Sequence, residues 1–384
     1  MEPMERKSNP HQDRHSGTTN GVGLPRDLII DILSRLPAKF ICQFRCVSKP
    51  WLSILSPPDS LLQNLHRNRS NSTPLLMFSE NSYPHICLSS FDTQGQLRNQ
   101  FTKHISSPVL KWRFCQGLMC FICEDHVYVC NPSTQVFLQV PYSIKLRVLY
   151  NFALGYLPST NEYKIVHWFV ETDSNGVYQI VCQIFTLKEG GSNAQGSWRV
   201  IGNSPHFIID SRFPICLNGS IYWFGDEHRN SGDPMNIYAF DLATEEYETV
   251  LCPRAYSGSF DTCVRLLSIK GTLCLVDFKQ CRSHVDIWMM KDQSNQIWVK
   301  EYSFDMFTKN RSIRNIHYIP SGDGRDEEIL IGQRKEGLLL YNIKTRSIRK
   351  MGKFSNENTG IEIDMGRYLW PHLYFDSLDS LVAR

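Results

Sequence analysis

A run of cysteines with one histidine is the first place in this sequence where side chains could hold a metal. The segment "FCQGLMCFICEDHVYVC" contains Cys115, Cys120, Cys123, His126 and Cys130, and thiolate and imidazole are ligands that zinc prefers. Residues three apart on a strand, as Cys120 and Cys123 are, point to opposite faces of a sheet. No second close pair at finger-like spacing completes a tetrahedral site. We therefore interpret these cysteines as small buried thiols and expect no metal and no cofactor.

Carboxylates and nucleophiles offer the other routes to chemistry. The acidic stretches "DGRDEE" at 323–328 and "EE" at 245 lie in predicted turns, where solvated loops are more common than acid/base pairs. The chain contains no Gly-rich phosphate loop, no nucleophile elbow and no papain-like signature. We therefore predict that it is not an enzyme and has no catalytic residues, and we keep a hydrolase or lyase as the least favoured alternative.

The composition is typical of a globular protein, and its net charge does not indicate a nucleic acid or a membrane surface as a partner. It has 384 residues, with 41 basic and 38 acidic side chains and a formal net charge of +3, which is too small for a dedicated nucleic-acid or membrane-surface binder. The thirteen cysteines are scattered, and no apolar run resembles a signal peptide or a membrane span. We expect reduced thiols in the cytoplasm or nucleus.

The elements that must position any site begin after residues 1–22, a polar stretch that predicts a disordered tail. Leu24, Leu28, Ile32 and Leu36 recur every four residues, which is the spacing of an amphipathic helix. Pro37 ends that helix.

The same spacing resumes at Phe40, Phe44, Val47 and Trp51 and predicts a second helix, with a short third helix starting near Trp51. A unit of this size is below the roughly 40 residues at which unaided folding becomes unlikely. Its apolar stripe therefore predicts a protein interaction site.

From about residue 75 the sequence alternates as strands and turns do. Units of strand, polar turn and strand begin at positions 127, 182, 237, 285 and 338, with a weaker copy at 88. Their period of roughly 50 residues matches kelch-like propellers. Preceding hairpin signals such as "CQGLMCFI", "LNGSIYWF" and "IKGTLCLV" predict four-stranded blades, about six in number. A tandem of β-sandwiches is the alternative, disfavoured by the regular repeat.

Residues 24–55 resemble the F-box motif. The segments that carry the resemblance are the opening "LP", the helix "DLIIDILSRLP" and the stretch "FRCVSKPW"; Phe40 and Pro50 depart from the commonest residues of the motif. Downstream, "FALGYLPSTNEYKIV", "SWRVI", "FPICLNGSIYWF" and "IYAFDLATEEYETV" resemble the F-box-associated domain of the large plant F-box family. The paired glycines of true kelch repeats are missing, so the expectation is a kelch-like propeller without kelch motifs.

The resemblance implies a mainly β protein with a small all-α N-terminal module. We expect a disordered tail at 1–22, a three-helix F-box at 23–66, a linker at 67–74 and an F-box-associated, kelch-like β-propeller of about six blades at 75–378. Surface loops at 171, 188, 226 and 320 are expected to be solvated connectors, and the surface that binds a target is unknown.

The resemblance also implies a function. The chain would be the substrate-recognition subunit of a Skp, cullin and F-box E3 ubiquitin ligase, linked through a Skp-type adaptor to cullin and RING subunits, with the β domain binding an unidentified target protein for ubiquitination. The alternative is a non-degradative protein-interaction module or a ligand-binding propeller. The implied adaptor contacts are Leu24, Pro25, Leu28, Ile32, Leu33, Leu36, Pro37, Phe44, Val47 and Trp51.

Overall fold

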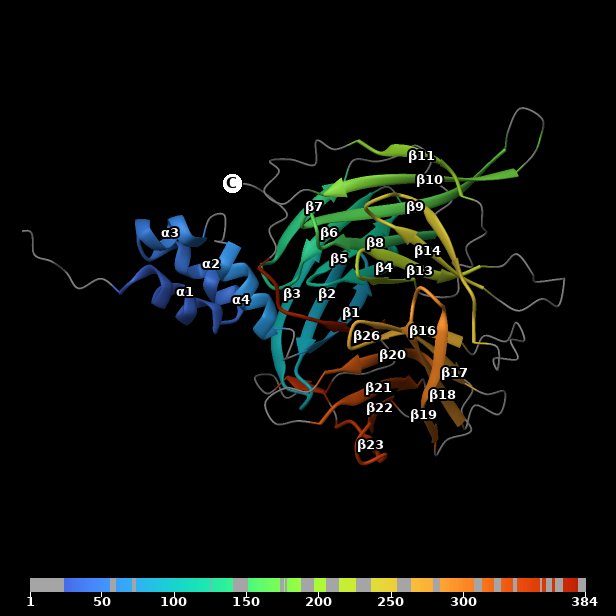
Figure 1. The fold of residues 1–384 in the computed structure, drawn as a ribbon. Coiled ribbons are helices and arrows are strands. Elements are labelled where there is room, and N and C mark those ends of the chain that lie inside the picture. The colour runs from blue at the N-terminus through green and yellow to red at the C-terminus, as the bar shows by residue number, and fades with distance from the viewer. Residues whose placement is uncertain are drawn as a thin grey trace, which may run out of the picture.

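The fold comprises a small helical module beside a ring of β-sheets (Figure 1). The computed structural model describes residues 24–378. Within that range it leaves out 56–59, 71–73, 125, 141–150, 173–175, 177, 188–196, 205–213, 226–235, 254–263, 279–283, 307–312, 321–325, 334–336, 353, 357–360 and 363–368. The expected tail at 1–22 lies outside the described residues.

Prolines set the starts of the first two helices. Pro25 and Pro37 each occupy the residue before a helix, a place where a fixed backbone angle and a missing N–H cost nothing. The described part of the module contains four α-helices and a short 3-10 turn, where three helices were expected. They are α1 (Arg26–Ser34), α2 (Ala38–Gln43), the 3-10 turn (Phe44–Cys46), α3 (Lys49–Leu55) and α4 (Ser60–Ser70). Helix α4 extends into the range 67–74 that was expected to be a linker.

Six four-stranded antiparallel sheets form the blades. Blade 1 contains β26 (Leu369–Tyr374), β1 (Leu75–Ser82), β2 (His85–Phe91) and β3 (Leu97–His104). Blade 2 contains β4 (Val109–Cys115), β5 (Leu118–Cys123), β6 (Val127–Asn131) and β7 (Val136–Val140). Blade 3 contains β8 (Asn151–Leu157), β9 (Glu162–Thr172), β10 (Tyr178–Leu187) and β11 (Arg199–Asn203).

The remaining blades follow in chain order. Blade 4 contains β12 (Ile215–Leu217), β13 (Ser220–Phe224), β14 (Ile237–Asp241) and β15 (Tyr247–Val250). Blade 5 contains β16 (Val264–Ile269), β17 (Thr272–Phe278), β18 (His284–Asp292) and β19 (Ile297–Asp305). Blade 6 contains β20 (Ile313–Ile319), β21 (Glu328–Gln333), β22 (Gly337–Asn342) and β23 (Ile348–Lys350), and a short pair, β24 (Ser355–Asn356) and β25 (Ile361–Glu362), comes before β26.

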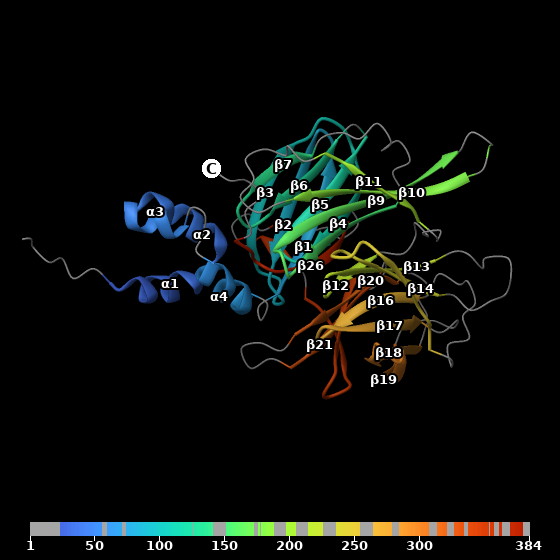
Figure 2. The ribbon, with the colours of Figure 1, turned by 45° about the horizontal axis from the view of Figure 1, so that its top comes forward.

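The ring closes because β26, from the end of the described chain, pairs with β1 from its beginning. Leu75 is opposite Tyr374 in this antiparallel pair. The shared blade holds the first and last blades of the ring together, and the radial arrangement leaves only short, protected sheet edges. Figure 2 shows the blades arranged around a common axis, with the helical module on one side.

Turn chemistry explains the hairpins that the sequence predicted. Strands β12 and β13 are joined by Asn218 and Gly219, which both have positive φ, 51° and 83°. Positive φ at both central residues defines the turn whose twist matches paired strands, and Asn-Gly is its preferred pair. The β16–β17 hairpin has the same kind of turn, at Lys270 (φ 51°) and Gly271 (φ 74°), and the β4–β5 hairpin has a two-residue turn in which Gln116 has a φ of 53°. All three hairpin predictions are confirmed.

Apolar side chains between neighbouring blades form the core of the ring. Strands β5 and β13 are almost entirely buried, as expected for strands covered on both faces. Separate clusters lie between successive blades, such as the one that joins blades 5 and 6. The prediction of about six blades is confirmed, and the alternative of tandem sandwiches is wrong. None of the helices in the described ranges is long and apolar enough to cross a membrane.

Candidate functional site

Helix α1 presents an uncovered apolar face. Leu24, Leu28 and Ile32 are spaced by four residues and are 55%, 50% and 46% exposed. Most large apolar side chains in the described protein are buried, and single exposed ones are normal. Leu28 and Ile32 share one face of helix α1 and Leu24 lies two residues before its start, and exposed apolar side chains that gather in this way mark an interaction surface.

Further exposed apolar side chains lie on the other elements of the module. Phe40, Val47, Leu52 and Leu61 are each more than 40% exposed, and together with the α1 face they account for about half of the exposed large apolar side chains in the described residues. We call these seven residues, Leu24, Leu28, Ile32, Phe40, Val47, Leu52 and Leu61, the apolar face. The adaptor contacts expected from the sequence did not include Phe40, Leu52 and Leu61. Phe40 follows the same four-residue spacing that selected Phe44, and could have been found from it.

The expected adaptor contacts fall into three groups by exposure. Exposed residues are Leu24, Pro25, Leu28, Ile32, Pro37 and Val47. Half-buried residues are Leu36, Phe44 and Trp51, which pack against the core of the module. Leu33 is 0% exposed, so in this structure it supports the fold of the module and presents no surface to a partner.

The core of the module is built from both ends of the chain. Ile30 and Leu33 of α1 pack with Leu378 from the segment after β26. Phe44 and Trp51 pack edge to face beside them, with ring centroids 5.7 Å apart, a favoured geometry for aromatic pairs. The helical module therefore depends on a residue that lies beyond the propeller in sequence.

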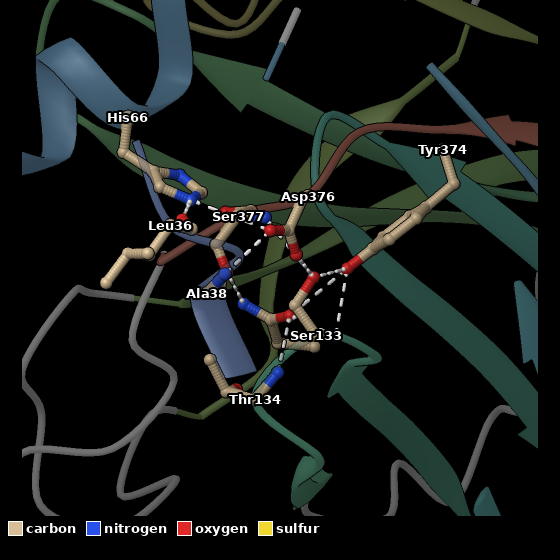
Figure 3. Close-up of polar contacts among 9 residues, drawn as sticks. Leu36, Ala38, His66, Ser133, Thr134, Tyr374, Asp376 and Ser377 are labelled. Atoms are coloured by element: carbon tan, nitrogen blue, oxygen red, sulfur yellow. Dashed lines mark hydrogen bonds and ion pairs between the residues drawn. The ribbon is translucent and has the colours of Figure 1, made fainter. Parts of the chain in front are cut away.

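A polar network joins the segment after β26 to the helices (Figure 3). Asp376 Oδ2 accepts a hydrogen bond from the backbone N–H of Ala38 at 2.7 Å, and this N–H is one of those that a helix start leaves without an intrahelical partner. His66 Nε2 lies 3.1 Å from the carbonyl oxygen of Leu36 and 3.6 Å from the same carboxylate oxygen. The carboxylate thus contacts both α2 and α4.

The same segment is bound to blade 2 on its other side. The Ser133 hydroxyl, in the β6–β7 turn, donates to Asp376 Oδ1 and contacts the Tyr374 hydroxyl. The Ser133 N–H donates to the Tyr374 hydroxyl at 2.9 Å, and Asn131 Nδ2 donates to the carbonyl oxygen of Ser377 at 3.0 Å. Burial raises the pKa of Tyr374, so its hydroxyl remains neutral. We call residues 374–378 the strap, because they connect the helical module to blade 2.

Gly117 lets the strap approach blade 2 closely. A Cβ at this position would clash with the side chain of Ser377. The turn between β4 and β5 therefore has no side chain where the strap crosses it, which is a common reason for glycine at a site of close backbone approach.

The cysteine-rich segment has a structural role in this fold. Cys115, Cys120, Cys123 and Cys130 are buried in β4, β5 and β6. Burial raises the pKa of Cys120 and Cys130, which keeps the thiols protonated, whereas metal binding and nucleophilic attack need the thiolate. Among the residues that the structure describes, no group of three or more His, Cys, Asp or Glu side chains is placed to hold a metal ion.

The described carboxylates of the two acidic stretches form ion pairs with cations of the propeller, and residues 323–325 lie outside the described residues. Glu245 bonds both Lys164 at 3.0 Å and Arg199 at 2.6 Å, which joins blades 3 and 4. Burial raises the pKa of Glu245, but hydrogen bonds from Arg199 and Lys164 outweigh it, and the net pKa is lowered. Glu328 pairs with Arg349 at 3.0 Å. Both carboxylates are paired with cations, which does not favour a role as proton donors.

Two family models match the chain, one for each part of the fold. The model described as "F-box domain" matches residues 23–62, and the model described as "F-box associated beta propeller domain" matches residues 70–361. The chain belongs to the F-box-associated β-propeller family. Its F-box contains α1 to α3 and the beginning of α4, and its propeller model ends before β26.

Relatives in Arabidopsis thaliana align with this chain over most of their length. "Putative F-box protein At5g50220" is 27% identical over 367 residues, which cover 94% of this chain and 90% of the relative. "F-box protein At5g65850" is 26% identical over 404 residues, which cover 98% and 92%. Among solved structures, "Kluyveromyces lactis Hsv2 complete loop 6CD" aligns at 11% identity with a TM-score of 0.36 over 71% of this chain and 74% of that one, a likeness too low to support any inference.

Proposed function

We propose that this F-box protein is the substrate-recognition subunit of a Skp, cullin and F-box ubiquitin ligase. In this proposal the F-box binds a Skp-type adaptor, which links it to cullin and RING subunits, and the propeller holds a target protein for ubiquitination. The observation that carries the proposal is the apolar face on an F-box that is attached firmly to a propeller. The F-box and the propeller domain that the two family models match support this role.

The chemistry of the apolar face fits a stable protein partner. Large apolar side chains at the centre of an interface supply most of its binding energy, while neighbouring polar groups exclude water. A standard interface buries about 800 Å² on each partner, and the face extends over four helices. The adaptor would cover side chains that are left in solvent when the chain is alone.

The proposed role of the chain is positional. Proteins of the F-box and propeller family are typically non-catalytic subunits, and holding a target beside another enzyme raises its effective concentration without any new contact at the reacting atoms. We also propose the cytoplasm or nucleus as the compartment, because the odd number of cysteines fits reduced thiols.

Adaptor binding by variants of the apolar face tests the proposal. We expect the full chain to bind a purified Skp-type adaptor, measured by calorimetry, and Leu28→Asp to weaken binding by about 2 kcal/mol or more, as for a central anchor. Leu28 is a better probe than Leu33, because it is 50% exposed and Leu33 is fully buried.

A matched control lies on the propeller. Tyr178 is 71% exposed, so Tyr178→Asp places the same charge on an exposed apolar position far from the F-box, and it should leave adaptor binding unchanged. Absence of binding by the unaltered chain, or equal weakening by both variants, would exclude the proposed role of the apolar face.

A further inference from the structure

Two cysteines from different blades meet beside the propeller axis. Cys115 is the last residue of β4 in blade 2, and Cys216 is the middle residue of β12 in blade 4. Cys115 is a member of the apolar cluster between blades 2 and 3, and Cys216 packs against the same cluster. Both are free thiols in the structure. The ring therefore brings together two thiols that are far apart in the sequence.

The backbone of blade 3 holds the sulfur atom of Cys216. The backbone N–H of Tyr156, in β8, donates to Cys216 Sγ at 3.2 Å. The thiol in turn donates to the carbonyl oxygen of Tyr156 at 3.7 Å. Both backbone groups of one residue thus contact a single sulfur atom. A sulfur atom that accepts a backbone N–H can carry negative charge more easily, because a hydrogen bond to the charged form of a group favours that form.

The thiol of Cys115 is a second donor to this sulfur atom. Its hydrogen bond is the largest cause that lowers the pKa of Cys216. Burial acts in the opposite direction, and the N–H of Tyr156 adds to the lowering. The hydrogen bond also means that the two sulfur atoms are in direct contact. The pair therefore consists of a stabilised thiolate with a thiol beside it.

Other buried cysteines of the propeller have the opposite environment. Burial raises the pKa of Cys182 and of Cys274 to about 12, and it also raises the pKa of Cys120 and Cys130. The thiolate is the form that attacks oxidants, and the protonated thiol is unreactive. These four cysteines are therefore poor nucleophiles at neutral pH, whereas the contacts of Cys216 favour its thiolate.

An axial cavity of about 560 Å³ lies next to the pair. Its wall includes residues of the innermost strands of the blades, and both Cys115 and Cys216 line it. A water molecule occupies about 30 Å³ of liquid, and hydrogen peroxide is only slightly larger, so the cavity has room for it. Cys216 is half-buried and Cys115 is buried. The stabilised thiolate is thus the more accessible of the two sulfur atoms.

We propose that Cys216 and Cys115 form a redox-active pair that small hydroperoxides oxidise to a disulfide between blades 2 and 4. Reactive cysteines of this kind are partly exposed and lie beside a resolving cysteine. This site goes beyond the ligase role and does not depend on adaptor binding.

The reaction has two steps. The Cys216 thiolate attacks one oxygen atom of hydrogen peroxide, and the O–O bond breaks to give a sulfenic acid and hydroxide, which takes up the proton that Cys216 had lost. The sulfur of Cys115 then attacks the sulfenic sulfur, so that the S–S bond forms, the S–O bond breaks and the hydroxyl leaves as water with the proton of Cys115. Two electrons pass from the two sulfur atoms to the peroxide, which becomes two water molecules.

The disulfide would lie at the end of the propeller to which the strap is bound. Cys115 directly precedes the β4–β5 turn, where Gly117 lies against Ser377 of the strap. Strand β8 contacts both β4 and β12, so a bond between the outer two would enclose it. Oxidation would therefore link three successive blades beside the strap, and reduction would release them.

Peptide mapping of the full chain after brief exposure to hydrogen peroxide tests the proposal. We expect a disulfide between Cys115 and Cys216 while Cys46, which is exposed on the F-box, remains a free thiol. The Cys216 thiol should be lost faster than the Cys46 thiol by about 10-fold or more, and dithiothreitol should restore it. Equal rates for the two cysteines, or a main product in which Cys216 is linked to any other cysteine, would overturn the proposal.

Two substitutions of Cys115 separate its roles as donor and as resolving thiol. Cys115→Ser keeps a hydrogen-bond donor but cannot form a disulfide, so the sulfenic acid should persist at Cys216 and be trapped by dimedone. Cys115→Ala also removes the donor and should slow the reaction of Cys216 with peroxide by about 10-fold, whereas the Ser variant should keep most of the rate. A rate in the Ala variant equal to that of the unaltered chain would overturn the proposed stabilisation of the thiolate.

A matched control lies in the same blade as Cys216. Cys252 is also half-buried, and Cys252→Ser should change neither the rate nor the product. Mapping of the unaltered chain needs no substitution, so it remains decisive if a Cys115 variant is less stable. Adaptor binding is measured separately on the reduced chain, so failure of this site and failure of the ligase proposal are distinguishable.

Discussion

Truncating one buried leucine of the strap should weaken the F-box more than the propeller. Leu378 is 4% exposed and packs with Ile30 and Leu33 of α1, although it follows the last propeller strand. Leu→Ala in a core costs about 2–5 kcal/mol, because apolar contacts are lost and a cavity is left. We expect Leu378→Ala to lower the free energy of F-box opening by about 3 kcal/mol.

Native-state hydrogen exchange measures this effect segment by segment. A loss of about 3 kcal/mol corresponds to roughly a 150-fold loss of protection, which should appear in peptides from α1 and α2, with β17 and β18 nearly unchanged. Leu251→Ala is the control, because Leu251 is 58% exposed and its truncation should change neither module. Unchanged protection of α1, or an equal loss in β17, would refute the idea that the strap completes the F-box core.

Two further predictions concern the propeller. Burial is the main cause that lowers the pKa of His372 to about 3. Between pH 3 and pH 6.5 the unfolded state therefore binds more protons than the folded state. The free energy of unfolding should fall as the pH falls through this window, by at most about 1.4 kcal/mol per pH unit. His372→Phe keeps a ring stacked on Phe114 and should reduce the dependence of the melting temperature on pH below pH 6.5. The same pH dependence in the variant and the unaltered chain would contradict this. Glu245→Gln should lower stability by about 2–4 kcal/mol in chemical denaturation, because Lys164 is 9% exposed and loses its ionic partner; a change below about 0.5 kcal/mol would show that the pair is not important.

The blades were predictable because each is a local structure. A unit of strand, turn and strand is repeated along the chain, and turns such as Asn218-Gly219 mark its hairpins, so a local pattern suffices. Blade 1 was not predictable in the same way, because Leu75 pairs with Tyr374 from the other end of the described chain. A repeating local pattern contains no information about a contact between residues so far apart in the sequence.

The expected adaptor contacts show a second limit of local patterns. Helix α1 is apolar on two faces, with Leu28 and Ile32 exposed and Ile30 and Leu33 buried. Spacing identifies apolar stripes but does not tell which stripe a distant segment will cover, and here the covering residue is Leu378. The helix α4 was missed for a related reason, because the pair of prolines before it is typical of the end of a helical unit.

The strap gives the order of synthesis a functional consequence. Asp376 follows Ala38 by 338 residues, so a ribosome must translate every blade before the F-box receives its last core residue and the N–H of Ala38 receives its acceptor. A nascent chain that stalls within the propeller would therefore expose an unfinished F-box together with an open ring. In the proposed ligase role, only chains whose recognition domain has been completed would then be competent to bind the adaptor.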